Sequence, residues 1–216
     1  MTARLVRITV VLVLGTMLGA CADEPSTGSG GSTTPSASAT PTVTATPTAT
    51  VTATPTATAT VEVTIARRSG PLLEAGDTVP EFMAPALDGG VFTWSDYVGT
   101  PTVLAVWAPW CPHCQVELPR LSAAVQTHPA LQLVSVATAI GAVEGPTPQE
   151  YMDAEGLTFP VALDDAQATL MQGLGVTSFP TVYYVDASGA VVAATTGELE
   201  PAALERILAQ LEGVTP

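Results

Sequence analysis

Two cysteines, Cys111 and Cys114, follow directly on an apolar run that ends at Trp107. The run has the length and composition of a buried strand. Pro112 suits the first turn of a helix, because the N–H that proline lacks would have no partner there. A helix that begins at Cys111 points its free N–H groups and the positive end of its dipole at that sulfur, which favours the thiolate. The pattern therefore predicts a strand that leads into a redox-active dithiol.

The spacing of the two cysteines assigns them different roles. Cys111, at the N-terminus of the helix, is the predicted nucleophile. Cys114, one helical turn further along and more buried, is the predicted resolving thiol. A structural disulfide and half of a zinc site are the alternatives. A tetrahedral zinc site needs two more ligands, and the remaining candidates are His128, carboxylates and Cys21. We therefore favour thiol–disulfide chemistry and expect neither a metal nor a cofactor.

Several segments around the cysteines resemble one known family. They are residues 103–114, Glu117, Pro119, residues 175–181 and residues 184–189. They are similar to the membrane-anchored, extracytoplasmic thioredoxin-like proteins of the TlpA/ResA type, and the resemblance covers about residues 72–212. It implies an α/β thioredoxin-like fold, with a central mixed sheet flanked by helices, an N-terminal strand extension and a central helical insertion between about 138 and 160. It also implies thiol-disulfide oxidoreductase activity.

The resemblance adds further residues to the predicted site. Phe179 and Pro180 match the family's cis-proline loop, in which the proline lies against the disulfide and the preceding backbone pairs with an extended substrate; a trans turn proline is the alternative. Glu117 matches a carboxylate that the family uses near its active site, where a partly buried carboxyl with a raised pKa can move protons to and from the resolving cysteine. The alternative is a solvated helix glutamate. The predicted client-facing residues are Trp110, Pro112, His113, Phe179 and Pro180.

His113 bears on the direction of the reaction. A cation beside Cys111 stabilises the thiolate, hence the reduced form, and makes the protein more oxidising. Pro-His is also the dipeptide of the periplasmic disulfide-donating oxidases, which the sequence otherwise does not resemble. The family as a whole leans towards reduction, so the sequence leaves the direction open.

The N-terminus has the pattern of a lipoprotein leader. Residues 1–21 carry Arg4 and Arg7, then an apolar run, then Leu-Gly-Ala-Cys, which resembles a lipobox. The apolar run is too short for a spanning helix. Cys21 is the predicted acylated first residue of the mature protein, which also accounts for the third thiol. An ordinary signal peptide with a stray cysteine is the alternative. We expect a lipid-anchored protein that faces the extracytoplasmic space.

Residues 22–70 are predicted to be a disordered tether. Most of the segment consists of Thr, Ala, Pro, Ser, Gly and Val, and residues 46–53 recur as residues 54–61 with one Val and Ala exchanged. Such a composition lacks the large side chains that build a core and favours extended geometry. Glycosylation of the threonines is an alternative use of the segment. Val61, Val63 and Ile65 alternate with polar residues and could form an edge strand.

Residues 71–216 have the length of one domain with a full core. Apolar runs alternate with helical patterns in this segment, which favours a sheet covered by helices. The predicted strands are 91–94, 102–108, 131–137, 159–163, 181–186 and 190–195, and the predicted helices are 112–127, 147–155, 165–173 and 201–211.

The chain is acidic, with a formal net charge of -14. It has no lysine, and two of its six basic residues fall in the leader. Nucleic acid is therefore an unexpected partner, and binding to anionic lipid headgroups is disfavoured apart from the anchor. The expected partners are exported client proteins and a membrane redox protein that recycles the dithiol.

Two other functions deserve comparison. One is a redoxin-type thiol peroxidase, but the reactive cysteine of that class follows a threonine three residues earlier, and here that position is Ala108. The other is a copper-binding lipoprotein. Copper-delivery relatives usually show C-x-x-x-C and a later histidine, and neither pattern appears.

Overall fold

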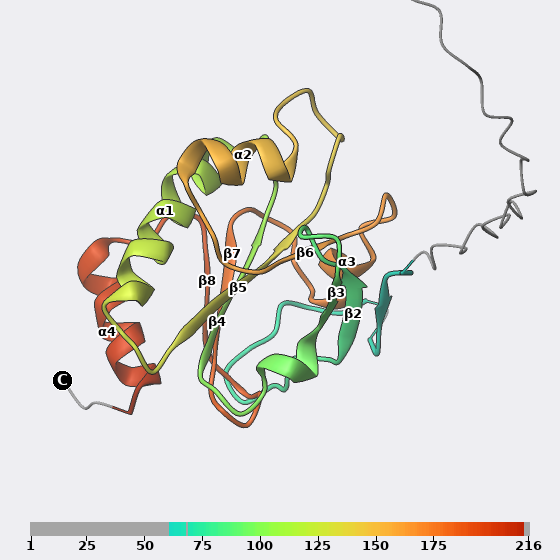
Figure 1. Ribbon diagram of the computed structural model, residues 1–216. Coiled ribbons are helices and arrows are strands. Elements are labelled where there is room, and N and C mark those ends of the chain that lie inside the picture. The colour runs from blue at the N-terminus through green and yellow to red at the C-terminus, as the bar shows by residue number, and fades with distance from the viewer. Residues whose placement is uncertain (1–60, 68, 214–216) are drawn as a thin grey trace, which may run out of the picture. The chain divides into compact units, whose positions relative to one another are not determined.

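The computed structural model describes residues 61–67 and 69–213 (Figure 1). The predicted signal peptide, including Cys21, and residues 22–60 of the predicted tether lie outside these residues. In the part of the chain that the structure describes, no helix combines the length and the apolar character needed to cross a bilayer.

A mixed five-stranded sheet forms the centre of the domain, in the order β6-β5-β4-β7-β8. Strand β4 pairs in parallel with β5, and β5 with β6, whereas β7 is antiparallel to both β4 and β8. All six residues of β4 are buried, as expected for a strand covered on both faces. The strands are β4 (Thr102–Trp107), β5 (Gln132–Ala137), β6 (Val161–Leu163), β7 (Thr181–Val185) and β8 (Val191–Thr196).

Helices cover both faces of this sheet (Figure 1). Side chains alternate along β4, so that Val103 and Ala105 pack in one cluster and Leu104 and Val106 in another. The first cluster contains the apolar faces of α1 and α4, and the second contains α3. The helices are α1 (Pro112–Gln126), α2 (Pro148–Glu155), α3 (Thr169–Gly173) and α4 (Pro201–Leu211). The predicted α/β thioredoxin-like architecture is confirmed, with α2 as the helix inserted between β5 and β6.

A second, three-stranded antiparallel sheet forms the predicted N-terminal extension. It comprises β1 (Thr64–Ile65), β2 (Phe82–Pro85) and β3 (Val91–Thr93), in that order, and leads into a 3-10 helix, η1 (Trp94–Tyr97). Phe82 stacks on both Phe92 and Trp94, with ring centroids 5.6 and 5.8 Å apart. These rings join the cluster that holds Leu104 and Val106, so the extension completes the core on that face.

The folded part of the chain begins before the boundary predicted at residue 71. Thr64 and Ile65 pair with Met83 and Phe82, which makes β1 the edge strand that the alternation near Ile65 suggests. Ile65 also packs against the core cluster. The boundary prediction missed this because the polar stretch from Arg67 to Gly70 separates a strand of only two residues from the rest of the domain.

The other differences between prediction and structure are local. Helix α3 begins at Thr169 rather than at 165, because the carboxylates of Asp164 and Asp165 accept the N–H groups of Thr169, Leu170 and Met171 and thereby cap its first turn. The structure contains two elements that were not predicted from the sequence, β2 and η1. Every strand and helix that was predicted has a counterpart in the structure.

Candidate active site

The two cysteines lie where β4 meets α1. Cys111 is the N-cap of the helix, and its Sγ accepts a hydrogen bond from the backbone N–H of Cys114 at 3.3 Å. Pro112 occupies the first turn, as predicted. Both cysteines are free thiols; 5% of Cys111 and none of Cys114 is exposed. Burial, together with the hydrogen bond to Cys111, raises the pKa of the Cys114 thiol far above its ordinary value. Cys114 is therefore held as a thiol inside the domain, while Cys111 lies nearer the surface, where a client disulfide can reach it.

Two buried aromatic side chains, Trp107 and Tyr151, pack in the same cluster as the two cysteines. Trp107, the last residue of β4, is fully buried, and its Nε1 donates to Ser135 Oγ on β5 at 3.1 Å. Its ring lies 5.1 Å from that of Tyr151, which α2 supplies. The inserted helix thus packs against the same cluster as the cysteines.

The predicted cis-proline loop faces the nucleophilic end of the site. The Phe179–Pro180 peptide bond is cis, which confirms the predicted geometry. The Phe179 carbonyl accepts a hydrogen bond from Cys111 Sγ at 3.8 Å. The Phe179 ring meets the ring of Trp110 edge to face at 6.0 Å. Trp110 and Phe179 are both only partly buried, so they form an aromatic border beside Cys111.

Glu117 is fully buried on the same helix, one turn after Cys114. Its Oε2 accepts the backbone N–H of Leu199 at 3.3 Å and lies 3.8 Å from Arg120 Nη1, while its Oε1 has no partner among the described residues. Burial raises the pKa of this carboxyl; the Leu199 N–H and Arg120 oppose that rise, and the nearby Glu198 charge adds to it. Glu117 is thus a carboxyl that takes up a proton more readily than an exposed glutamate.

Glu198 is a neighbour that the sequence analysis missed. It lies in the turn between β8 and α4, where its Oε1 is 2.8 Å from His113 Nδ1 and its Oε2 is 3.3 Å from Arg120 Nη1. The hydrogen bond with His113 is the largest of the effects that lower the pKa of the Glu198 carboxyl. His113 itself is 68% exposed. Because 85 residues separate His113 from Glu198, no local pattern reveals the pair.

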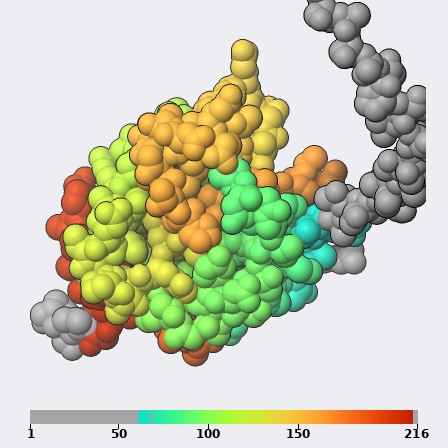
Figure 2. Space-filling model, viewed as in Figure 1, coloured from blue at the N-terminus to red at the C-terminus, as the bar shows by residue number. Residues whose placement is uncertain are grey.

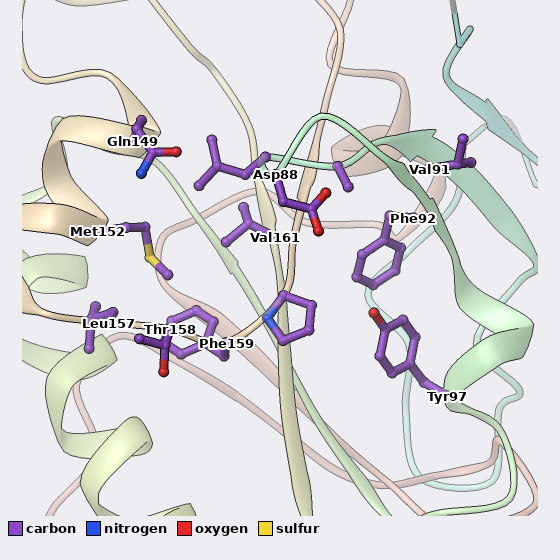
Figure 3. A pocket seen from close by; sticks show the side chains of 13 residues that line it. Asp88, Val91, Phe92, Tyr97, Gln149, Met152, Leu157, Thr158, Phe159 and Val161 are labelled. Carbon is purple, nitrogen blue, oxygen red and sulfur yellow. The ribbon is translucent and has the colours of Figure 1, made fainter.

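A hollow of about 310 Å³ lies between the N-terminal extension and the inserted helix (Figure 3). Phe92 and Tyr97 line one side of it, and Met152 and Phe159 line the other. None of the predicted site residues lines it, so it is separate from the dithiol. Among the described residues, no three histidine, cysteine or acidic side chains gather in a way that could hold a metal ion.

Comparison with known proteins assigns the fold to a family. The sequence model of the AhpC/TSA family matches residues 75–194. The chain is 29% identical to the thiol-disulfide oxidoreductase ResA of Geobacillus thermodenitrificans over 143 residues, which are 65% of this chain and 78% of that protein. It is 32% identical to the soluble secreted antigen MPT53 of Mycobacterium tuberculosis over 121 residues, 55% of this chain and 66% of that one.

A solved structure supports the same assignment. A secreted disulfide oxidoreductase of Mycobacterium tuberculosis, homologous to DsbE of E. coli, superimposes with a TM-score of 0.52 and 29% identity, over 60% of this chain and 96% of that chain. The dithiol at the start of α1 agrees with the oxidoreductase activity for which ResA and the secreted mycobacterial protein of known structure are named. The chain belongs to the AhpC/TSA family and is a thioredoxin-like thiol-disulfide oxidoreductase.

Proposed function

We propose that this oxidoreductase exchanges disulfides with exported proteins through Cys111 and Cys114. The observation that supports this most directly is the hydrogen bond from the Cys114 N–H to Cys111 Sγ at the start of α1. A backbone donor and the helix dipole both stabilise negative charge on that sulfur. Cys111 is therefore the attacking thiolate, and the deeper Cys114, held as a thiol by its raised pKa, resolves the intermediate.

In the reducing direction, the Cys111 thiolate attacks one sulfur of a client disulfide. The client S–S bond breaks, its other sulfur leaves as a thiolate and takes a proton, and a Cys111–client disulfide forms. Cys114 then loses its proton and attacks Cys111 Sγ, which expels the second client thiol. Two electrons pass from the dithiol to the client, and a Cys111–Cys114 disulfide remains. The oxidising direction is the reverse of these steps.

Glu117 is the proposed proton acceptor for Cys114. The second step requires a proton to leave a buried thiol of high pKa, which is slow without a nearby base. Glu117 lies one turn further along α1, and burial brings the pKa of its carboxyl closer to neutrality. The client-facing residues are Trp110, Pro112, His113, Phe179 and Pro180, with the client backbone running along the segment before the cis bond.

We place the protein at the outer face of a membrane, anchored through lipid on Cys21. The lipobox-like sequence and the Thr- and Pro-rich segment that follows it support this placement. One relative is named a secreted antigen, which supports an extracytoplasmic location. A membrane redox partner would return the dithiol to its working state after each turnover.

An insulin-reduction assay of the full chain with dithiothreitol as electron source tests the proposal. We expect insulin precipitation to accelerate with the wild type and to return to the uncatalysed rate with Cys111→Ala. Peroxide consumption and a copper titration of the same protein distinguish the two other functions. Rapid peroxide turnover, or tight copper binding without insulin reduction, would contradict the proposal.

A further inference from the structure

The loop between β5 and α2 is fastened at both of its ends to Trp110. At one end, the indole Nε1 of Trp110 donates to the Ala139 carbonyl at 2.9 Å. At the other, Gly145 approaches so closely that a Cβ there would lie 3.0 Å from Trp110 Cβ. The Ala139 carbonyl also accepts the N–H of Ala142 at 3.2 Å, which closes a tight turn inside the loop. Trp110 thus fixes this loop beside the reactive cysteine.

Ala139 reaches this arrangement in an unusual backbone conformation. Its φ is 50°, in the left-handed region that residues with a Cβ seldom adopt. Such conformations persist where the surrounding contacts hold them, and they gather at functional sites. Here the contact is the hydrogen bond from the Trp110 indole. The shape of the loop is therefore coupled to a residue that immediately precedes Cys111.

The fastened loop carries two aliphatic side chains on its outer surface. Ile140 is 39% and Val143 is 53% exposed, and residues 138–143 contain no charged side chain. Figures 1 and 2 show the segment rising from the body of the domain between β5 and α2. Ile140 adjoins Ala139 and Val143 is two residues from Gly145, so each lies within about 8 Å of chain from a point of contact with Trp110. The two exposed side chains therefore lie on a loop whose backbone adjoins Trp110 at two points.

We propose that Ile140 and Val143 form a client rim, a docking surface for an extended client segment that has aliphatic or aromatic side chains beside its reactive cysteine. The inference rests on the proposed function. A client must bring its sulfur to Cys111 Sγ, so the residues that flank the client cysteine pass over the adjacent border. That border is apolar, and apolar side chains gain free energy by leaving water there.

Charge favours the same occupant. The chain has a net charge of -14, and Glu144 follows the client rim directly, so an acidic client segment would be repelled. An apolar segment avoids this repulsion and covers two side chains that otherwise stay exposed to water. The client rim therefore selects among disulfides by the residues around them and leaves the sulfur chemistry to Cys111 and Cys114.

The test uses two nine-residue peptides, each joined through one cysteine to glutathione as a mixed disulfide. Leucines flank the cysteine in one peptide and aspartates in the other. The full chain is mixed with each peptide and with dithiothreitol, which reduces the Cys111–Cys114 disulfide after each turnover, and release of glutathione above the uncatalysed rate gives kcat/KM. We expect the wild type to prefer the leucine peptide and the Ile140→Ser/Val143→Ser variant to lose about tenfold of that preference, mainly through KM. Trp110→Phe, which removes the N–H donor, should reduce the preference in the same direction.

The matched control replaces two apolar residues of similar exposure away from the loop, Met83 and Val98. Met83→Ser/Val98→Ser should keep the wild-type preference, because neither residue adjoins Trp110 in the structure. If the Ile140→Ser/Val143→Ser variant also kept the full preference while exchanging both peptides, the client rim would be refuted and the proposed function would stand. If the wild type exchanged neither peptide, the proposed function itself would fail.

Discussion

His113 Nδ1 and Glu198 Oε1 lie 2.8 Å apart, which joins the Pro-His dipeptide between the cysteines to the turn before α4. Arg120 binds the other carboxylate oxygen of Glu198 at 3.3 Å. A protonated His113 therefore has a negative partner beside it, and its effect on the Cys111 thiolate is offset in part. The Pro-His dipeptide alone suggests a more oxidising protein than this arrangement supports.

This pair predicts a specific pattern of reduction potentials. Glu198→Gln removes a negative charge from beside the dithiol and should raise the potential, because a carboxylate there disfavours the thiolate of the reduced form. His113→Ala should lower the potential, and it should do so more strongly in the Glu198→Gln background than in the wild type. Titration of the four proteins in glutathione buffers gives the coupling between the two sites. Equal effects of His113→Ala in both backgrounds would show that Glu198 does not change the influence of His113 on the dithiol.

Glu117→Gln should change how stability depends on pH. Because the pKa of Glu117 is raised in the folded state, the folded protein binds this proton more tightly than the unfolded chain. The contribution of Glu117 to stability is therefore greatest below the ordinary glutamate pKa of about 4.3 and falls as the pH rises through the folded value. The variant has no ionisable group at this position and so lacks this loss. The decrease in the free energy of unfolding from pH 5 to pH 8, measured with urea, should therefore be smaller in the variant than in the wild type. An unchanged pH dependence would contradict the assigned environment of Glu117.

Glu150→Gln is a control in which the effect on stability should depend on pH in the opposite direction. The Glu150 carboxylate accepts the N–H of Thr147 in a capping box, and this hydrogen bond lowers the pKa of Glu150. Its contribution to stability is present above the unfolded pKa and is lost as the pH falls. The same substitution at position 150 should therefore destabilise the protein at pH 8 and have little effect in acid.

His128 should stabilise the packing of α1 against α4 in a pH-dependent way. Its Nδ1 lies 2.8 Å from Glu212 and its Nε2 3.1 Å from Glu205, and the hydrogen bond with Glu212 is the main cause of its raised pKa. The stabilisation is fully present below about pH 6.5 and lost as the pH rises through the folded pKa. His128→Ala should cost about 1 kcal/mol at pH 6 and less at pH 9. Equal thermal shifts at both values would argue against the pair.

The sequence predicted those parts of the site that neighbours along the chain determine. The position of Cys111 and Cys114 at a helix N-terminus follows from the apolar run before them and from Pro112 after the first cysteine. The place of Glu117 near the dithiol was suggested by the family resemblance, and a solvated helix glutamate was the alternative. The cis bond before Pro180 was available only through the family resemblance, because a trans proline is equally compatible with the sequence.

Contacts made by distant loops could not be predicted in this way. In the sequence, nothing distinguishes Glu198 from the other acidic residues. Its pairing with His113 arises only because the fold places the turn between β8 and α4 beside the start of α1. The edge strand at Ile65 is too short for its periodicity to identify it, and it gains its place by pairing with β2. The left-handed Ala139 depends on the indole of Trp110, which lies 29 residues earlier in the chain.

The anchor predicts where the protein is found and where it can be cut. Cys21→Ala should move the protein from the membrane to the soluble fraction, which fractionation and immunoblotting would show. Limited proteolysis of the wild type should release a domain that retains β1, with cleavage between Asp23 and Thr60. Membrane retention of the Cys21→Ala protein would contradict the lipid anchor.

Cys111 attacks the client and Cys114 resolves the intermediate, and trapping of mixed disulfides tests this assignment of roles most directly. Each single alanine variant is incubated with an oxidised exported protein and analysed by non-reducing electrophoresis and mass spectrometry. We predict that Cys114→Ala accumulates a covalent complex through Cys111, because the resolving thiol is absent, and that Cys111→Ala forms none. Complexes formed by Cys111→Ala in equal or greater yield would contradict the account.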